Sequence, residues 1–260
     1  MNGLVRKSNG IYKEYEDLLL RRDQLLREAG SIKIAYMKEF GEYLLEAFEL
    51  KIDCIRLKKM IAFCQAAINR GELVDEAEMN EQISRSMALY EMQLKEMITE
   101  KIDAELAGKA PAYKAERARR IYRRLAKMIH PDISPLISEN EHLRDLWERI
   151  VIAYNCCDDE ELGNLEVLVR KVIRDSGTEI GTPDIDNIDE RIARLEEEIN
   201  NILTTEPYTY AQVLSSPEQI DAKLEEITCE IQEYSDYREE LTEVLKELLD
   251  EGGTPTWKTA

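Results

Sequence analysis

A long heptad pattern of apolar residues is the feature that most restricts how this chain can fold. Between residues 36 and 68, apolar side chains recur at alternating steps of four and three residues. These positions are Tyr36, Phe40, Tyr43, Ala47, Leu50, Cys54, Leu57, Ile61, Cys64 and Ile68. Such spacing keeps one stripe of a helix facing a partner helix, and it does not fit the alternation of a β-strand. The pattern therefore predicts an all-α protein of paired helices.

We expect residues 1–107 to form an antiparallel coiled coil of three helices. Two glycines, Gly30 and Gly71, interrupt the helical pattern, and each can end a helix. Ser31 and Asp75 follow them and are residue types that favour the N-cap of a new helix. Because both connections are short, the three helices should fold back on one another.

Two further breaks divide the rest of the chain. Gly and Pro within residues 107–113 indicate a module boundary, and residues 175–184 form a linker by the same criterion. We therefore expect a middle module at residues 108–176 and an acidic C-terminal αα-hairpin at residues 184–251. Heptad-spaced Ile and Leu residues predict the two helices of this hairpin.

The charge is unevenly distributed along the chain, which carries a formal net charge of -19. Residues 184–251 contain 21 acidic and five basic residues, whereas residues 114–130 contain seven basic residues and one acidic residue, Glu116. The middle module thus begins with a cationic helix in an anionic chain. Its arginines could form a solvated face, pair with the acidic C-terminal hairpin as an intramolecular cover, or dock on an acidic partner.

This basic helix runs into a His-Pro-Asp sequence. Pro131 forces the residue before it out of the α region, so the helix should end at His130. Ser138 and Glu141 match a capping box that would open the next amphipathic helix. We expect two antiparallel helices that display an exposed His-Pro-Asp at their joint; an ordinary helix stop followed by a turn is the alternative.

The stretch YRRLAKMIHPD, residues 122–132, resembles the second helix and signature loop of a J-domain, the module of DnaJ-type co-chaperones. In that family a Tyr stands eight residues before the His and is followed by two basic residues and a Leu-Ala pair, as in residues 122–126. The third J-domain helix carries an aromatic residue, a β-branched residue and an Ala-Tyr pair. The matching residues are Trp147, Ile150, Ala153 and Tyr154. The resemblance covers about residues 115–157.

Other parts of the J-domain pattern are missing from the sequence. No Tyr and Leu-Gly pair of a first J-domain helix precedes the basic helix, and we expect the helix end from Met97 to Leu106 to pack in that place. Residues 158–173 lack the KR and YD sequences of the fourth helix. The chain also has no Gly/Phe-rich segment and no Cys-rich zinc module.

The resemblance implies a partner, the DnaK-type heat-shock ATPase. In the family, the basic helix docks on an acidic face of the ATPase, and the His-Pro-Asp loop accelerates its ATP hydrolysis. The residues that this implies for triggering are His130, Pro131 and Asp132. Those that it implies for docking are Tyr122, Arg119, Arg123, Arg124 and Lys127. The coiled coils would bind a client protein of unknown identity and could also join copies of the chain in a homo-oligomer.

The sequence offers no catalytic, cofactor or metal site, so we expect a protein that is not an enzyme. It has no nucleophile–base pair and no phosphate-binding glycine loop, and its histidines are His130 and His142. The five cysteines lack C-x-x-C spacing, and no apolar stretch is long enough to span a bilayer. We therefore expect a cytoplasmic protein with reduced thiols.

Two other functions remain open. A coiled-coil scaffold could carry a J-like hairpin that has no effect on an ATPase. A nucleic-acid binder could use the basic helix, but a cationic patch one helix long in an anionic chain argues against that function.

Overall fold

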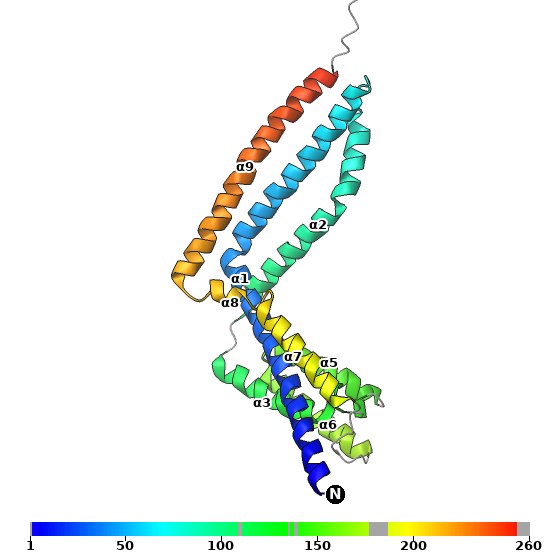
Figure 1. Cartoon of the computed structure of the whole chain (residues 1–260), viewed down its shortest axis with the longest axis vertical. Coiled ribbons are helices and arrows are strands. Elements are labelled where there is room, and N and C mark those ends of the chain that lie inside the picture. Colours follow the sequence, from blue (N-terminus) through cyan, green and yellow to red (C-terminus); the bar gives the residue numbers. More distant parts are fainter. Residues whose placement is uncertain (1, 109–110, 135, 138–139, 177–186, 254–260) are drawn as a thin grey trace, which may run out of the picture. The chain divides into compact units, whose positions relative to one another are not determined.

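The computed structural model describes residues 2–108, 111–134, 136–137, 140–176 and 187–253 (Figure 1). Within these ranges the regular secondary structure is α-helical and no strand is present. The predicted all-α class is therefore confirmed. No helix of the described residues combines the length and the apolar character needed to cross a bilayer.

The chain forms two compact units that do not follow chain order. The first unit combines Met1–Ile32 with Gly108–Thr209, and the second combines Lys33–Ala107 with Tyr210–Ala260. Helix α1, Asn2–Asn69, contributes its first part to one unit and the remainder to the other.

The predicted helix end at Gly30 is wrong, because α1 continues through this residue without a turn. Ser31 is not an N-cap: its hydroxyl donates a hydrogen bond to the carbonyl oxygen of Arg27 within the same helix. Apolar residues are buried on both sides of the glycine, Leu25 before it and Phe40 after it. An interior Gly costs a helix only about 1 kcal/mol relative to Ala. Packing on both sides outweighs that cost, so residues 2–69 do not form the predicted pair of helices.

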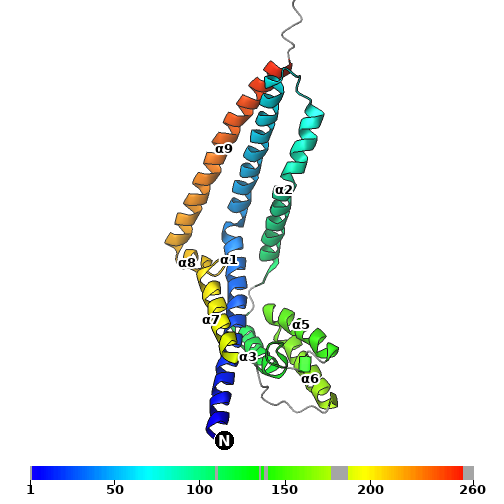
Figure 2. The same ribbon diagram turned by 45° about the vertical axis from the view of Figure 1, so that its right-hand side comes forward.

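The second unit contains residues 33–69 of α1, α2 (Glu76–Leu106) and α9 (Pro217–Gly253), which run alongside one another (Figure 2). The predicted turn at Gly71 is present, with φ of +70°, and Asp75 caps α2 by accepting hydrogen bonds from the N–H groups of residues 77 and 78. Most of the predicted heptad stripe is buried, but Tyr43 is 41% exposed. The short helix α8 (Tyr210–Val213) adds Tyr210, which stacks on Tyr36 at 4.0 Å between ring centroids.

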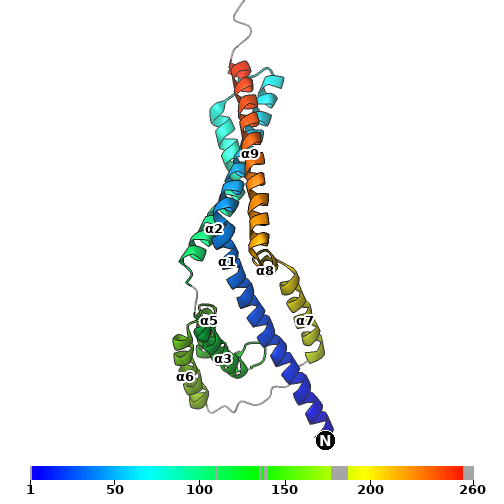
Figure 3. The ribbon, with the colours of Figure 1, turned by 90° about the vertical axis from the view of Figure 1, so that its left-hand side faces the viewer.

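The first unit is built on three helices, α3 (Ala112–Ile129), α5 (Glu141–Asn155) and α6 (Asp159–Ser176), which pack on one another (Figure 3). Their buried cluster includes Leu125, Ile150 and Leu165. Helix α6 thus provides the third side of this core. Helix α5 begins at Glu141 with Asn140 as its N-cap, whose side chain accepts a hydrogen bond from the N–H of Leu143. The predicted cap, Ser138, lies outside the described residues.

The two helices predicted to form the C-terminal hairpin fall in different units. Helix α7 (Ile188–Thr204) lies in the first unit, whereas α9 lies in the second. Within the first unit, Leu195 of α7 packs with Tyr15 and Leu19 of α1. The helix end Met97–Leu106, which we expected against the middle module, belongs to the second unit, and α6 packs on α3 and α5 instead.

The uninterrupted α1 predicts that Gly30→Ala stabilises the protein by about 1 kcal/mol, since Ala loses less backbone entropy in a helix. A Cβ added at Gly30 meets no atom within 4 Å. Urea unfolding followed by circular dichroism measures the change. Gly71→Ala is the matched control and should destabilise by about 1 kcal/mol, because φ of +70° at Gly71 disfavours a side chain. A loss of stability in Gly30→Ala would contradict a helical Gly30.

Candidate functional site

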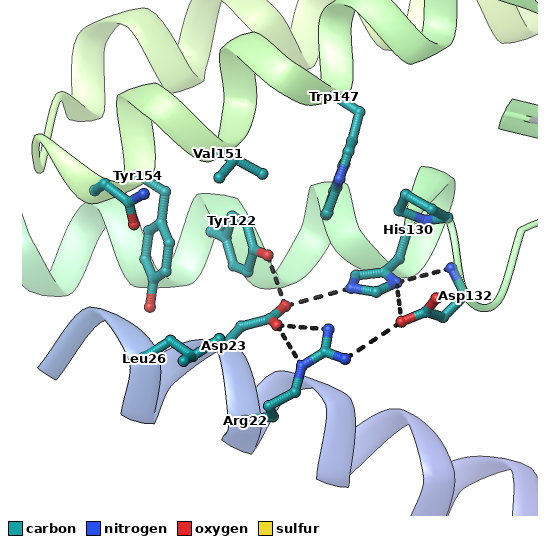
Figure 4. Close-up of a pocket in the computed structure, with 11 residues that line it drawn as sticks. Arg22, Asp23, Leu26, Tyr122, His130, Asp132, Trp147, Val151 and Tyr154 are labelled. Carbon is teal, nitrogen blue, oxygen red and sulfur yellow. Dashed lines mark hydrogen bonds and ion pairs between the residues drawn. The ribbon is translucent and has the colours of Figure 1, made fainter. Parts of the chain in front are cut away.

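The His-Pro-Asp residues line a pocket of about 270 Å³ in the first unit (Figure 4). Helix α3 contributes Tyr122, and α5 contributes Trp147 and Tyr154. The opposite wall is the first part of α1, with Arg22 and Asp23. The structure therefore brings the signature loop together with residues that lie about 100 positions earlier in the chain.

Helix α3 ends where the sequence predicts. The N–H of His130 makes the last helical hydrogen bond, at 2.9 Å to the carbonyl oxygen of Ala126, and the ψ angle of 132° at His130 is extended. This conformation is the one that a following proline favours. The carbonyl oxygen of His130 then accepts hydrogen bonds from the N–H groups of Ile133 and Ser134, at 3.1 and 2.8 Å. These bonds close a turn around Pro131 and Asp132.

An aromatic wall supports the turn. The rings of Tyr122 and Tyr154 stack at 4.0 Å between centroids, with 10° between their planes. The ring of His130 meets Trp147 edge-on at 4.9 Å. Residues that the sequence pattern places on two helices and a loop thus pack as one aromatic group.

The predicted exposure of the signature loop is wrong for His130. Its exposed fraction is 3%, because Trp147 and α1 cover the ring. Pro131 is exposed, and the side chain of Asp132 is 42% exposed. Only the outer edge of the turn faces solvent.

Asp23 is the polar centre of the pocket. Its Oδ2 accepts a hydrogen bond of 2.7 Å from the Tyr122 hydroxyl and lies 3.4 Å from Nε2 of His130 (Figure 4). Nδ1 of His130 accepts a hydrogen bond of 3.1 Å from the N–H of Asp132. Because Nδ1 is an acceptor, a neutral ring carries its proton on Nε2, where it points to the Asp23 carboxylate.

The surroundings of Asp23 favour its charged form. Burial alone would raise the pKa of Asp23, but hydrogen bonds from His130 and Tyr122 and the charge of Arg22 hold this pKa below its ordinary value. For Tyr122, burial and the neighbouring Asp23 raise the pKa. The pair therefore consists of an ionised carboxylate and a neutral phenol that donates to it.

Arg22 connects the turn to two helices. Its Nη2 lies 2.9 Å from Oδ1 of Asp23, and its Nη1 lies 3.5 Å from Oδ2 of Asp132. The same guanidinium reaches Glu198 of α7 at 3.7 Å. Arg22 and Asp23 were not predicted as site residues, since no motif includes them and the helix predicted to contain them ended at Gly30.

The basic residues of α3 divide into three groups by their partners. Toward α6, Arg117 lies 3.2 Å from Asp159, and Arg124 lies 2.7 Å from Glu166. Toward α1, Lys127 lies 3.1 Å from Glu16, and Arg119 donates a hydrogen bond to the Gln24 side chain. Arg120 and Arg123 are exposed and make no ion pair within the described ranges. The intramolecular partners thus lie on α1 and α6 rather than on the acidic C-terminal segment that the charge distribution suggested.

No model of a known protein family matches the chain, and no curated protein or solved structure is similar to it at a significant level. The described residues contain no group of three or more His, Cys, Asp or Glu side chains that could hold a metal ion. The site is defined by its geometry: a carboxylate between a Tyr and a His, an aromatic wall and an exposed Pro-Asp edge.

The ion pairs between α3 and α6 generate a pH-dependent prediction. The hydrogen bond from Arg124, supported by Arg170, lowers the pKa of Glu166 to about 2. A lowered pKa means that Glu166 stabilises the fold above its ordinary pKa of 4.5, and that this contribution is lost as the pH falls toward 2. We expect Glu166→Gln to lower the free energy of unfolding by about 1 kcal/mol at pH 7. The difference from wild type should shrink toward zero at pH 2.

Urea unfolding at both pH values measures this effect. Glu148→Gln on α5 is the matched control, because Glu148 is exposed and has no ion pair in the described part of the chain. An equal loss for Glu166→Gln at pH 7 and at pH 2 would assign the effect to packing rather than to charge.

Proposed function

We propose that α3, α5 and the turn between them form a J-domain-like module of a co-chaperone, which docks on a DnaK-type heat-shock ATPase and stimulates its ATP hydrolysis. The single observation that carries this proposal is the aromatic wall. Tyr122, His130, Trp147 and Tyr154 are the residues that the family resemblance singles out, and they contact one another around the end of the basic helix. An ordinary helix stop has no need of this arrangement.

The proposed mechanism requires no chemistry within this chain. A partner that binds one conformation of the ATPase more tightly than another shifts the ATPase toward that conformation. The exposed Pro131 and Asp132 would make this contact, and His130 would hold the turn in shape through its bond with the N–H of Asp132. The exposed Arg123 would attract an acidic face of the partner and speed the encounter.

The other assigned docking residues hold intramolecular contacts in this structure. Arg119 and Lys127 face α1, Arg124 faces α6, and Tyr122 donates to Asp23. In the proposed function the long helices of the second unit serve as an adaptor for a client protein, and they could also join copies of the chain. A cytoplasmic location belongs to the same proposal, because the proposed partner class includes the cytoplasmic heat-shock ATPases.

The second candidate is a coiled-coil interaction scaffold whose J-like hairpin has no effect on an ATPase. One observation favours it. His130 is 3% exposed and contacts Asp23, so the histidine side chain of the signature is not accessible to a partner protein in this structure. The two candidates differ in a single measurable property, the stimulation of ATP hydrolysis.

A single-turnover ATPase assay with the cognate DnaK-type chaperone tests the proposal. We expect the wild-type chain to raise the hydrolysis rate by about 5-fold or more, the range of a typical coupling between two sites. His130→Gln should abolish the stimulation, because it breaks the contacts that shape the turn.

His142→Gln provides the matched control, since His142 is the other histidine and is exposed on α5 outside the pocket. It should stimulate as wild type does. Undiminished stimulation by His130→Gln, with unchanged helical content in circular dichroism, would rule out the proposed role of the loop. Absence of stimulation by the wild-type chain would favour the scaffold, unless a variant that loosens the contacts of α1 with the pocket stimulates the ATPase.

A further inference from the structure

One segment of α1, residues 16–27, occupies the surface that the proposed function assigns to the ATPase. Five of the eight assigned residues contact this segment. Asp23 binds Tyr122 and His130, Arg22 binds Asp132, Gln24 binds Arg119, and Glu16 binds Lys127. All are contacts between side chains. The docking face is therefore partly covered in this structure: Tyr122 and His130 are buried, whereas Pro131, Arg123 and Arg124 are exposed.

All of the covering residues except Arg22 lie on one face of α1, together with Arg27, whose guanidinium lies over the Tyr154 ring at 4.9 Å from its centroid. Glu16, Asp23, Gln24 and Arg27 are separated by steps of seven, one and three residues, which places them along a single stripe of a helix. Three of them present a carboxylate or an amide oxygen to the cationic helix α3. This segment thus offers α3 the same chemistry that an acidic partner would offer.

The buried apolar core of α3, α5 and α6 is built mainly from these three helices. Among the described residues, Leu20 is the one that α1 contributes to their buried apolar cluster. Tyr15 and Leu19 pack instead with Leu195 of α7 and with Ile133 of the turn. The three helices also come from one continuous stretch, residues 112–176, so they can separate from α1 without unthreading the chain.

Polar contacts make up much of what holds the segment on α3. Release exchanges these hydrogen bonds and ion pairs for water, a small net change per contact when both partners become solvated. It also exposes Leu20 and Leu25, both buried here, and this favours the covered state in the isolated chain. Such an interface can populate two states, as polar contacts between domains do.

We propose that residues 16–27 of α1 are an intramolecular competitor of the ATPase, which must leave α3 before the ATPase docks. This inference rests on the proposed function and specifies how the site is regulated. The ATPase binds the uncovered state, so its apparent affinity is reduced in proportion to the fraction of chains that are uncovered. Weakening the cover raises that fraction without altering any residue that touches the ATPase.

The test uses a full-length double variant, Glu16→Gln with Asp23→Asn, which keeps the side-chain shapes but removes the two carboxylates that face α3. The matched control, Glu14→Gln with Glu39→Gln, removes two charges from exposed positions of α1 that have no ion pair in the described residues. We expect the double variant to reach half-maximal stimulation of the DnaK-type ATPase at a lower concentration than wild type. The concentration should fall by about 5-fold or more, the range of a typical coupling between two sites. The control should behave as wild type.

A second readout reports the cover without the ATPase. Trp147 lines the pocket opposite α1, so in a Trp257→Phe background its fluorescence reports access to this pocket. Acrylamide quenching should be stronger in the double variant than in wild type or the control. Glu16→Gln alone, which keeps every Asp23 contact, should give a smaller change in the same direction, and this distinguishes release from misfolding.

The outcomes separate the two proposals. Equal quenching in wild type and the double variant would overturn the cover. Stronger quenching with unchanged half-saturation of a stimulated ATPase would also overturn it, because release would then not control docking. Stronger quenching with no stimulation by any variant would overturn the co-chaperone function while retaining the cover as a contact that opens.

Discussion

The way in which α1 joins α3 and α5 depends on one partly buried carboxylate, that of Asp23. A charged group removed from water needs donors, and Asp23 obtains them from Tyr122, His130 and Arg22. Each donor comes with its own neighbours: Tyr122 with the stacked Tyr154, and His130 with Trp147 and the turn. The contacts of the Asp23 carboxylate therefore join α1 to α3 and α5. They also explain why His130 is buried although the next residue is an exposed proline.

The same carboxylate bears on the choice between the two candidate functions. If the contact with Asp23 were permanent, His130 would be a structural residue and the hairpin a part of a scaffold. If the contact can open, it holds the turn in shape while closed and limits the binding of the ATPase to the turn. The core of α3, α5 and α6 favours the second interpretation, because all of its buried apolar residues except Leu20 lie between residues 118 and 173 of the chain. The Tyr122, Trp147 and Tyr154 rings of the aromatic wall pack in that core.

Local signals in the sequence predicted the parts of the structure that local physics controls. Pro131 fixed the end of α3, Gly71 with Asp75 fixed the turn before α2, and the heptad stripe identified the buried face of α1. The turn assigned to Gly30 failed because tertiary packing on both sides of a glycine outweighs its helix propensity. Asp23 could not be predicted for a related reason. Its role follows from which helices pack together, and the sequence around an isolated Asp on a helix does not indicate a partner about 100 residues away.

Along the chain the three-helix core follows α2 and precedes α7, and α7 packs on α1 through Leu195 and Leu19. An uncovered core would therefore remain tethered close to the segment it had left. Re-covering is a first-order event, and its effective concentration is set by the tether, on the order of millimolar for short connections. Dilution of the protein does not change how strongly α1 competes for the surface of α3. The concentration of the ATPase therefore decides which of the two binds there.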